Sequence, residues 1–265
     1  MVDKSQEFIR LVRVGYAARG VVYILLGYLA LKSAKTASGG PQASFEFLQD
    51  LPLGFALLYV MAASLLAYAF YKLIAGLGDL ERKGSDAKGI VERIGYCASS
   101  LAHATLAWSA FQFAQGEKQS AGPDSRRDAV TSLLEWEIGA IVLGLLGLSL
   151  VVAAVFQGRS AITAHFMRTV GAGAPAIVCW LGRLGFAARA IAFLVIGWSL
   201  IQAAWLGTGT HAKGLGTALV SLRESSLLYI IVSVGLLMFG LFSLIVARFR
   251  IIPDVHKKDL KTRFN

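Results

Sequence analysis

Hydrophobic residues along this chain are gathered into six blocks of about 20 residues, separated by shorter polar stretches. At about 1.5 Å of rise per residue, a helix of that length crosses the roughly 30 Å hydrocarbon core of a bilayer. All five prolines lie outside the blocks or at their edges, which favours unbroken helices. The pattern predicts an all-α polytopic membrane protein with six transmembrane helices, at about residues 14–34, 53–77, 94–114, 138–156, 184–205 and 227–247.

Every second block begins with the same motif. Residues 13–19 read RVGYAAR, residues 93–99 read RIGYCAS and residues 183–189 read RLGFAAR. Spacings of 80 and 90 residues suit a two-helix hairpin with its connections. Because each copy holds an even number of spans, all copies insert the same way up, which predicts parallel repeats about a pseudo-threefold axis. The predicted units are repeats at 1–78, 79–158 and 159–250, followed by a basic cytoplasmic tail at 251–265.

Small residues recur every seven positions along the first helix of each copy, so they lie on one helix face. Small side chains let helix backbones approach closely, which is a main source of attraction between helices in lipid. Amphipathic stretches at 44–51, 128–136 and 216–224 predict short interfacial helices on the outer side, between the two spans of each copy. The predicted helix-packing residues are Gly20, Ser100 and Ala190, then Gly27, Ala107 and Gly197, then Ala34, Ala114 and Ala204.

The basic residues are distributed unequally between the two sides of the predicted topology. The side that carries both termini holds sixteen Lys and Arg, and the opposite loops hold seven. The positive-inside rule therefore places both termini in the cytoplasm. The net charge of +10 predicts attraction to anionic lipid headgroups on that side rather than to nucleic acid, for which no binding motif is present.

Three cations lie inside predicted spans. Lys72 is close enough to a span end to reach the interface by snorkelling. Arg19 and Arg189 lie about 9 Å deeper than the arginines that open their motifs. Three explanations are open for these two: snorkelling to lipid phosphates, pairing with backbone carbonyls or with Asp79, and binding of an anion or lipid headgroup.

A polar patch in the third span has no counterpart in the other two copies. It comprises Ser99, Ser100 and His103, and the histidine is either a hydrogen-bonded core residue or a ligand for a proton or a pigment metal. No metal or cofactor is predicted, since no Cys/His cluster is present and the other histidines lie in loops or the tail. The ligand or lipid-headgroup candidates are Arg13, Arg19, Arg93, Ser99, His103, Arg183 and Arg189.

The repeated motif resembles that of a family of bacterial integral membrane proteins, the domain of unknown function 1206 family, whose members carry three copies of a two-helix repeat. The resemblance rests on residues 13–23 and 183–189, and more weakly on 93–96, and it covers nearly the whole chain. The middle copy departs from it, with Ser99 where the outer copies have arginine. The resemblance implies a multi-pass protein of the bacterial inner membrane and gives no chemistry.

Some residues and motifs that particular classes of protein function require are missing from the sequence. No Asp or Glu lies within the six spans, so the carboxylates of a proton relay or a cation-coupled carrier are missing. No nucleotide-binding or hydrolase motif is present, which disfavours an enzyme. The first hypothesis is therefore a structural or accessory six-helix bundle that binds lipids, a partner membrane complex or copies of itself. The alternatives are a channel or carrier for an anionic or amphipathic solute, with Arg19 and Arg189 at its cytoplasmic mouth, and a pigment protein that rests on His103 alone.

Overall fold

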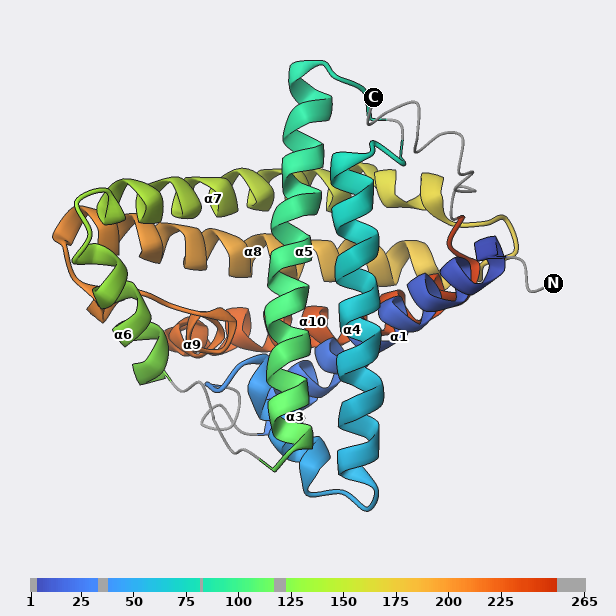
Figure 1. The fold of residues 1–265 in the computed structure, drawn as a ribbon, viewed down its shortest axis with the longest axis horizontal. Helices are drawn as coiled ribbons and strands as arrows, with labels where there is room; N and C mark the ends of the chain where they lie inside the picture. The colour runs from blue at the N-terminus through green and yellow to red at the C-terminus, as the bar shows by residue number, and fades with distance from the viewer. Residues whose placement is uncertain (1–3, 33–37, 82, 117–122, 252–265) are drawn as a thin grey trace.

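A computed structural model describes residues 4–32, 38–81, 83–116 and 123–251. Helices make up all the regular secondary structure of these residues (Figure 1), apart from one isolated bridge between Val170 and Arg250. The predicted all-α class is confirmed. The α-helices are α1 Lys4–Lys32, α3 Pro41–Gln49, α4 Gly54–Leu77, α5 Ala87–Ala114, α6 Pro123–Leu134, α7 Gly139–Thr163, α8 Ile177–Leu206, α9 Leu215–Ser221 and α10 Ser226–Phe249, with 3₁₀ turns η1 His165–Thr169, η2 Gly209–His211 and η3 Leu222–Glu224.

The helices follow one another in the order long, short, long, three times along the chain. The long helices α1, α5 and α8 carry the repeated motif, and each is followed by a short helix and a second long helix. The short helices α3, α6 and α9 begin three, five and one residues before the predicted amphipathic stretches. The hydrophobic pattern therefore located the long and short α-helices of the described residues, whereas it did not predict the 3₁₀ turns η1, η2 and η3.

Five of the described helices are long and apolar enough to cross a membrane. They are α4, α7, α8, α10 and the Val12–Lys32 part of α1. The predicted third span is a helix, α5, but it does not belong to these five. Ser99, Ser100, His103 and Thr105 lower its hydropathy. A multi-pass membrane protein is thus supported, and the sixth span stays a prediction.

The six long helices pack as three pairs. The most extensive pairs are α4 with α5, α7 with α8, and α1 with α10, so the second helix of each copy packs on the first helix of another. Helix α1 also contacts α4, and α10 contacts α8, so α1 and α10 link the other two pairs.

The middle copy differs from its sisters. Helices α5 and α7, its two long helices, are not among the described helix pairs in substantial contact. The long helices therefore form an open row, in the order α5, α4, α1, α10, α8 and α7. For this reason the structure does not confirm a closed pseudo-threefold ring.

The small residues of the first helices lie at close helix contacts. A Cβ atom on Gly20 would come within 2.9 Å of the Gly240 carbonyl oxygen, and Gly197 and Gly147 approach each other's carbonyl oxygens in the same way at 2.7 Å. The Ser100 hydroxyl donates to the Ala69 carbonyl on α4 at 2.8 Å. Ala107 and Ala114 are buried, Ala190 and Ala204 are half-buried opposite α7, and Ala34 lies outside the described residues.

Gly27 allows a direct test of the close packing between α1 and α10. A Cβ atom there would lie 2.7 Å from the Leu237 nitrogen and 2.8 Å from the Ser233 carbonyl oxygen, both of them backbone atoms of α10. We expect Gly27→Ala to lower the free energy of unfolding by about 1 to 3 kcal/mol, because the backbone of α10 would have to shift. Gly95→Ala is the matched control, since that glycine has nothing within 4 Å and alanine favours a helix. Thermal unfolding in detergent measures both, and equal melting temperatures would contradict the close approach.

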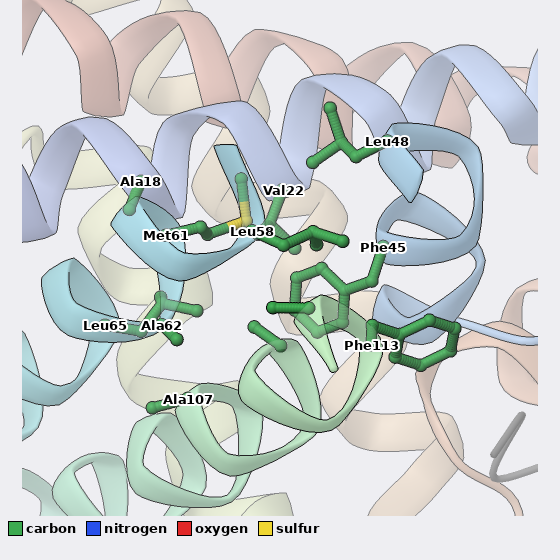
Figure 2. Packing of buried hydrophobic residues seen from close by; sticks show 12 residues of the cluster. Ala18, Val22, Phe45, Leu48, Leu58, Met61, Ala62, Leu65, Ala107 and Phe113 are labelled. Atoms are coloured by element: carbon green, nitrogen blue, oxygen red, sulfur yellow. The ribbon is translucent and has the colours of Figure 1, made fainter. Parts of the chain in front are cut away.

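The short helix α3 is part of the core. Its Phe45 and Leu48 point between α1, α4 and α5, where they meet Val22, Leu58 and Phe113 (Figure 2). Phe45 is fully buried, and Gln49 donates to the Phe113 carbonyl at 2.9 Å. Helix α3 therefore packs the C-terminal end of α5 against the helices of the first copy.

Candidate functional site

Arg19 lies where three long helices meet. Its guanidinium donates one hydrogen bond to the Tyr68 hydroxyl on α4 at 2.8 Å and another to the Ser243 hydroxyl on α10 at 3.0 Å. Ser243 itself donates to the Phe239 carbonyl one turn earlier, which leaves its oxygen free to accept. The side chain thus joins α1 to both of its neighbours in the row.

Aromatic rings surround the guanidinium groups of both span arginines. The Arg19 group lies 4.7, 5.3 and 5.0 Å from the ring centres of Tyr16, Tyr68 and Phe239. The Arg189 group, on α8, lies 5.5, 4.9 and 4.4 Å from those of Tyr23, Phe193 and Phe239. Cation–π contacts within about 6 Å are stabilising, and more so away from water. The Phe239 ring is shared, so one aromatic side chain of α10 contacts both cations.

Glu81 lies outside the helices, between α4 and α5, and its carboxylate interacts with two further cations, Lys72 and Arg250. It accepts hydrogen bonds from the Tyr71 hydroxyl at 2.8 Å, the Tyr96 hydroxyl at 2.6 Å and the Arg250 guanidinium at 2.6 Å. Its side chain is only 8% exposed. Burial by itself raises the pKa of Glu81, but the charges of Lys72 and Arg250 and the two tyrosine hydroxyls outweigh burial and lower the pKa to about 2.

Lys72 belongs to the same cluster. Its side chain is buried, and the ammonium lies 4.1 Å from the Tyr96 ring centre and 5.4 Å from that of Tyr71. The expectation that this lysine snorkels to the interface was wrong, because two tyrosine rings and the nearby Glu81 charge hold it inside the protein.

Arg250 joins two connections, the one between α4 and α5 and the one between α7 and α8. It pairs with Glu81, which follows α4, and donates to the Thr169 hydroxyl, which precedes α8, at 3.1 Å. The Ile251 nitrogen donates to the Thr169 carbonyl at 2.9 Å, beside the Val170–Arg250 bridge. The end of α10 therefore holds together the links between successive copies.

The cluster carries more positive than negative charge. Arg19, Lys72, Arg189 and Arg250 contribute four cations, and Glu81 contributes one carboxylate. Among the described residues, the Nε atoms of Arg19 and Arg189 are buried without a hydrogen-bond partner. The arrangement is suited to fixing helices to one another, and its charge would favour an anion.

His103 borders the Arg19 cluster through Tyr68. The His103 Nδ1 atom is 2.7 Å from the Ser99 carbonyl oxygen, to which it donates, and the His103 ring packs 4.6 Å from that of Tyr68. This is the geometry of a hydrogen-bonded core histidine. In the described part of the chain, no group of three His, Cys, Asp or Glu residues is placed to hold a metal ion.

The arginines that open the three motifs are not equivalent. Arg93 donates from Nε to the Gly76 carbonyl and from Nη2 to the Leu77 carbonyl, both at 2.8 Å, and so caps the end of α4. The Arg183 group lies 5.6 Å from the Trp180 ring centre. Arg13 is exposed and lines a surface groove between α1 and α10.

Comparisons with known proteins agree with this threefold division. A sequence profile for the family described as Domain of Unknown Function (DUF1206) matches three segments, residues 14–79, 94–164 and 184–250. The chain belongs to the DUF1206 family. It is also similar to the "Uncharacterized protein YxxB" of Bacillus subtilis (strain 168), with 30% identity over 242 residues, which cover 88% of this chain and 87% of that protein. No solved structure matches the chain.

The DUF1206 motif identified Arg19 and Arg189, but sequence reasoning missed their environment. Neither Glu81 nor Arg250 was among the predicted site residues. Of the three explanations left open for Arg19, none named the hydroxyl groups and rings that it contacts, and the Asp79 carboxylate accepts from the backbone nitrogens of Lys83 and Gly84. The recurring tyrosines near Arg19 were a signal that could have indicated an aromatic cluster.

Proposed function

We propose that this DUF1206 protein is a non-enzymatic, structural or accessory protein of the bacterial inner membrane, which binds anionic lipids or a partner membrane complex. In this proposal α5 is the sixth span, and both termini lie in the cytoplasm. The exposed side chains of α5 include Ile94, Leu101 and Trp108, which suits a helix that faces lipid on one side and α4 on the other. The excess of basic residues at the ends of α1 and α10 supports the orientation.

The enclosure of Arg19 and Arg189 by aromatic rings carries the proposal. A transported anion needs cations that face a hydrated path, whereas each of these guanidinium groups contacts three rings. Arg19 also donates two hydrogen bonds to hydroxyl groups of neighbouring helices. These contacts support a role in holding the long helices together.

Purification from native membranes in mild detergent tests the proposal. We expect anionic phospholipids to be enriched in the purified protein relative to the bulk membrane, with or without a co-purifying membrane protein, as measured by mass spectrometry. Labelling of cysteines introduced at residues 6 and 251 should require access from the cytoplasmic side. Bulk lipid composition without any partner, or labelling of either position from the periplasm, would contradict the proposal.

The excess of cations favours one second candidate, a channel or carrier for an anionic solute. The buried Nε atoms of Arg19 and Arg189 are the specific observation behind it. We expect vesicles with the wild-type protein to show no more anion flux than protein-free vesicles. If flux is present, loss of it in Arg19→Ala with Arg189→Ala, but not in the exposed pair Arg10→Ala with Arg159→Ala, would establish transport in place of the accessory role.

A further inference from the structure

A shallow groove of about 540 Å³ lies between the start of α1 and the end of α10. It is separate from the Arg19 cluster and opens to the surface of the protein. Two arginines lie on it, and its other lining residues are apolar. The lining residues are Arg13, Val14, Ala17, Leu244, Ala247 and Arg248.

The described lining residues give the groove a positive charge. Arg13 and Arg248 are both exposed, and no acidic residue is among the described residues that line the groove. Arg93, which opens the motif in the second copy, instead donates to two carbonyls at the end of α4. Arg13 makes no such contact within the described part of the chain, so the like charges of Arg13 and Arg248 both line the groove.

The apolar part of the groove runs along both helices toward the predicted hydrocarbon core. Val14 is 46% exposed, so it presents apolar surface beside the two arginines of the groove. Guanidinium groups match phosphate oxygens with paired hydrogen bonds, and basic pockets between transmembrane helices bind lipid headgroups. We infer that this groove binds one anionic phospholipid, with its phosphate between Arg13 and Arg248 and an acyl chain along Val14 and Leu244. The inference rests on the proposed function and names its lipid site.

Competition between two lipids tests the site. Purified protein in detergent is mixed with equal amounts of phosphatidylglycerol and phosphatidylcholine, and native mass spectrometry gives the ratio in which they are bound. We expect the wild type to prefer phosphatidylglycerol. Each basic residue near an anionic surface contributes about 1 kcal/mol, so Arg13→Gln with Arg248→Gln should lower that preference by about thirtyfold.

A matched pair of exposed arginines outside the groove is the control. Arg159→Gln with Arg168→Gln removes the same charge from another part of the surface and should leave the preference within about twofold of wild type. An equal loss in both pairs would overturn the site in favour of general charge attraction. Displacement of the bound lipid by millimolar inorganic phosphate would overturn the assignment of a lipid rather than a free anion.

A measurement on the wild-type protein does not depend on the folding of the variants. A photoreactive phosphatidylglycerol in vesicles should label peptides that contain residues 13–17 and 244–248. Labelling elsewhere, with the anionic preference intact, would overturn the groove while leaving lipid binding in place. Absence of any anionic preference in the wild type would overturn the groove and the lipid-binding form of the proposed function together.

Discussion

Glu81→Gln is expected to lower the free energy of unfolding by about 3 to 5 kcal/mol, because it leaves Arg250 buried without its ion-pair partner. The glutamine can still accept from one tyrosine hydroxyl, but it cannot balance the charges of Lys72 and Arg250. Thermal or denaturant unfolding in detergent measures the loss. Glu92→Gln is the matched control, since Glu92 pairs with Lys83 at 3.0 Å where both side chains are more exposed, and it should cost less than about 1 kcal/mol.

The Glu81 carboxylate also predicts that the free energy of unfolding depends on pH. The pKa of Glu81 is about 2 in the folded protein and 4.5 in its ordinary state, so the folded state favours the ionised form. This stabilisation, about 3 kcal/mol, is complete above pH 4.5 and is lost as the pH falls from about 4.5 to about 2. Wild-type protein should therefore lose more stability over that interval than Glu81→Gln. Parallel curves for the two proteins would contradict the buried ion pair.

Arg19→Ala is expected to lower the free energy of unfolding by about 2 to 4 kcal/mol. The change opens a cavity among the rings of Tyr16, Tyr68 and Phe239, and it removes the donor that pairs with the Tyr68 and Ser243 hydroxyls. Unfolding of the purified variant in detergent gives the size of the effect. Arg10→Ala, which removes an exposed arginine from the same helix, should stay within about 0.5 kcal/mol of wild type.

A second substitution separates packing from hydrogen bonding at this position. Arg19→Met keeps most of the side-chain volume and removes one of four clustered cations, so we expect it to recover at least half of the loss. A wild-type melting temperature for Arg19→Ala would contradict a stabilising role for the contacts of Arg19 with the rings and the two hydroxyls.

The fold was predictable because its signals are local. Hydrophobic runs, the repeated motif and the amphipathic stretches each depend on neighbours within one or two turns, and they located the long and short helices. The third span was harder, because Ser99, Ser100 and His103 dilute the apolar run of α5. Those same residues mark the copy whose two long helices are not in substantial contact.

The cluster could be predicted only in part, because its contacts join distant segments. The motif singled out Arg19 and Arg189, since a charge within an apolar block is conspicuous. Nothing local indicates that Glu81, in a connection, meets Arg250 at a separation of 169 residues. Nor does the approximate threefold pattern of the sequence reveal which pair of helices leaves the row open. Tertiary geometry decides such contacts.

The bond between Arg19 and Ser243 has a consequence for biogenesis. Its two ends are 224 residues apart, so the first helix is synthesised long before its main neighbour, α10. At about 5 to 20 residues per second, translation of the interval takes about 11 to 45 s. Throughout that time the guanidinium group of Arg19 is within or near the bilayer. It lacks the Ser243 hydroxyl as an acceptor, and it lacks the contact with the Phe239 ring. Ribosome-bound chains that stop before α10 should consequently be the forms most dependent on insertion factors and most exposed to membrane proteases.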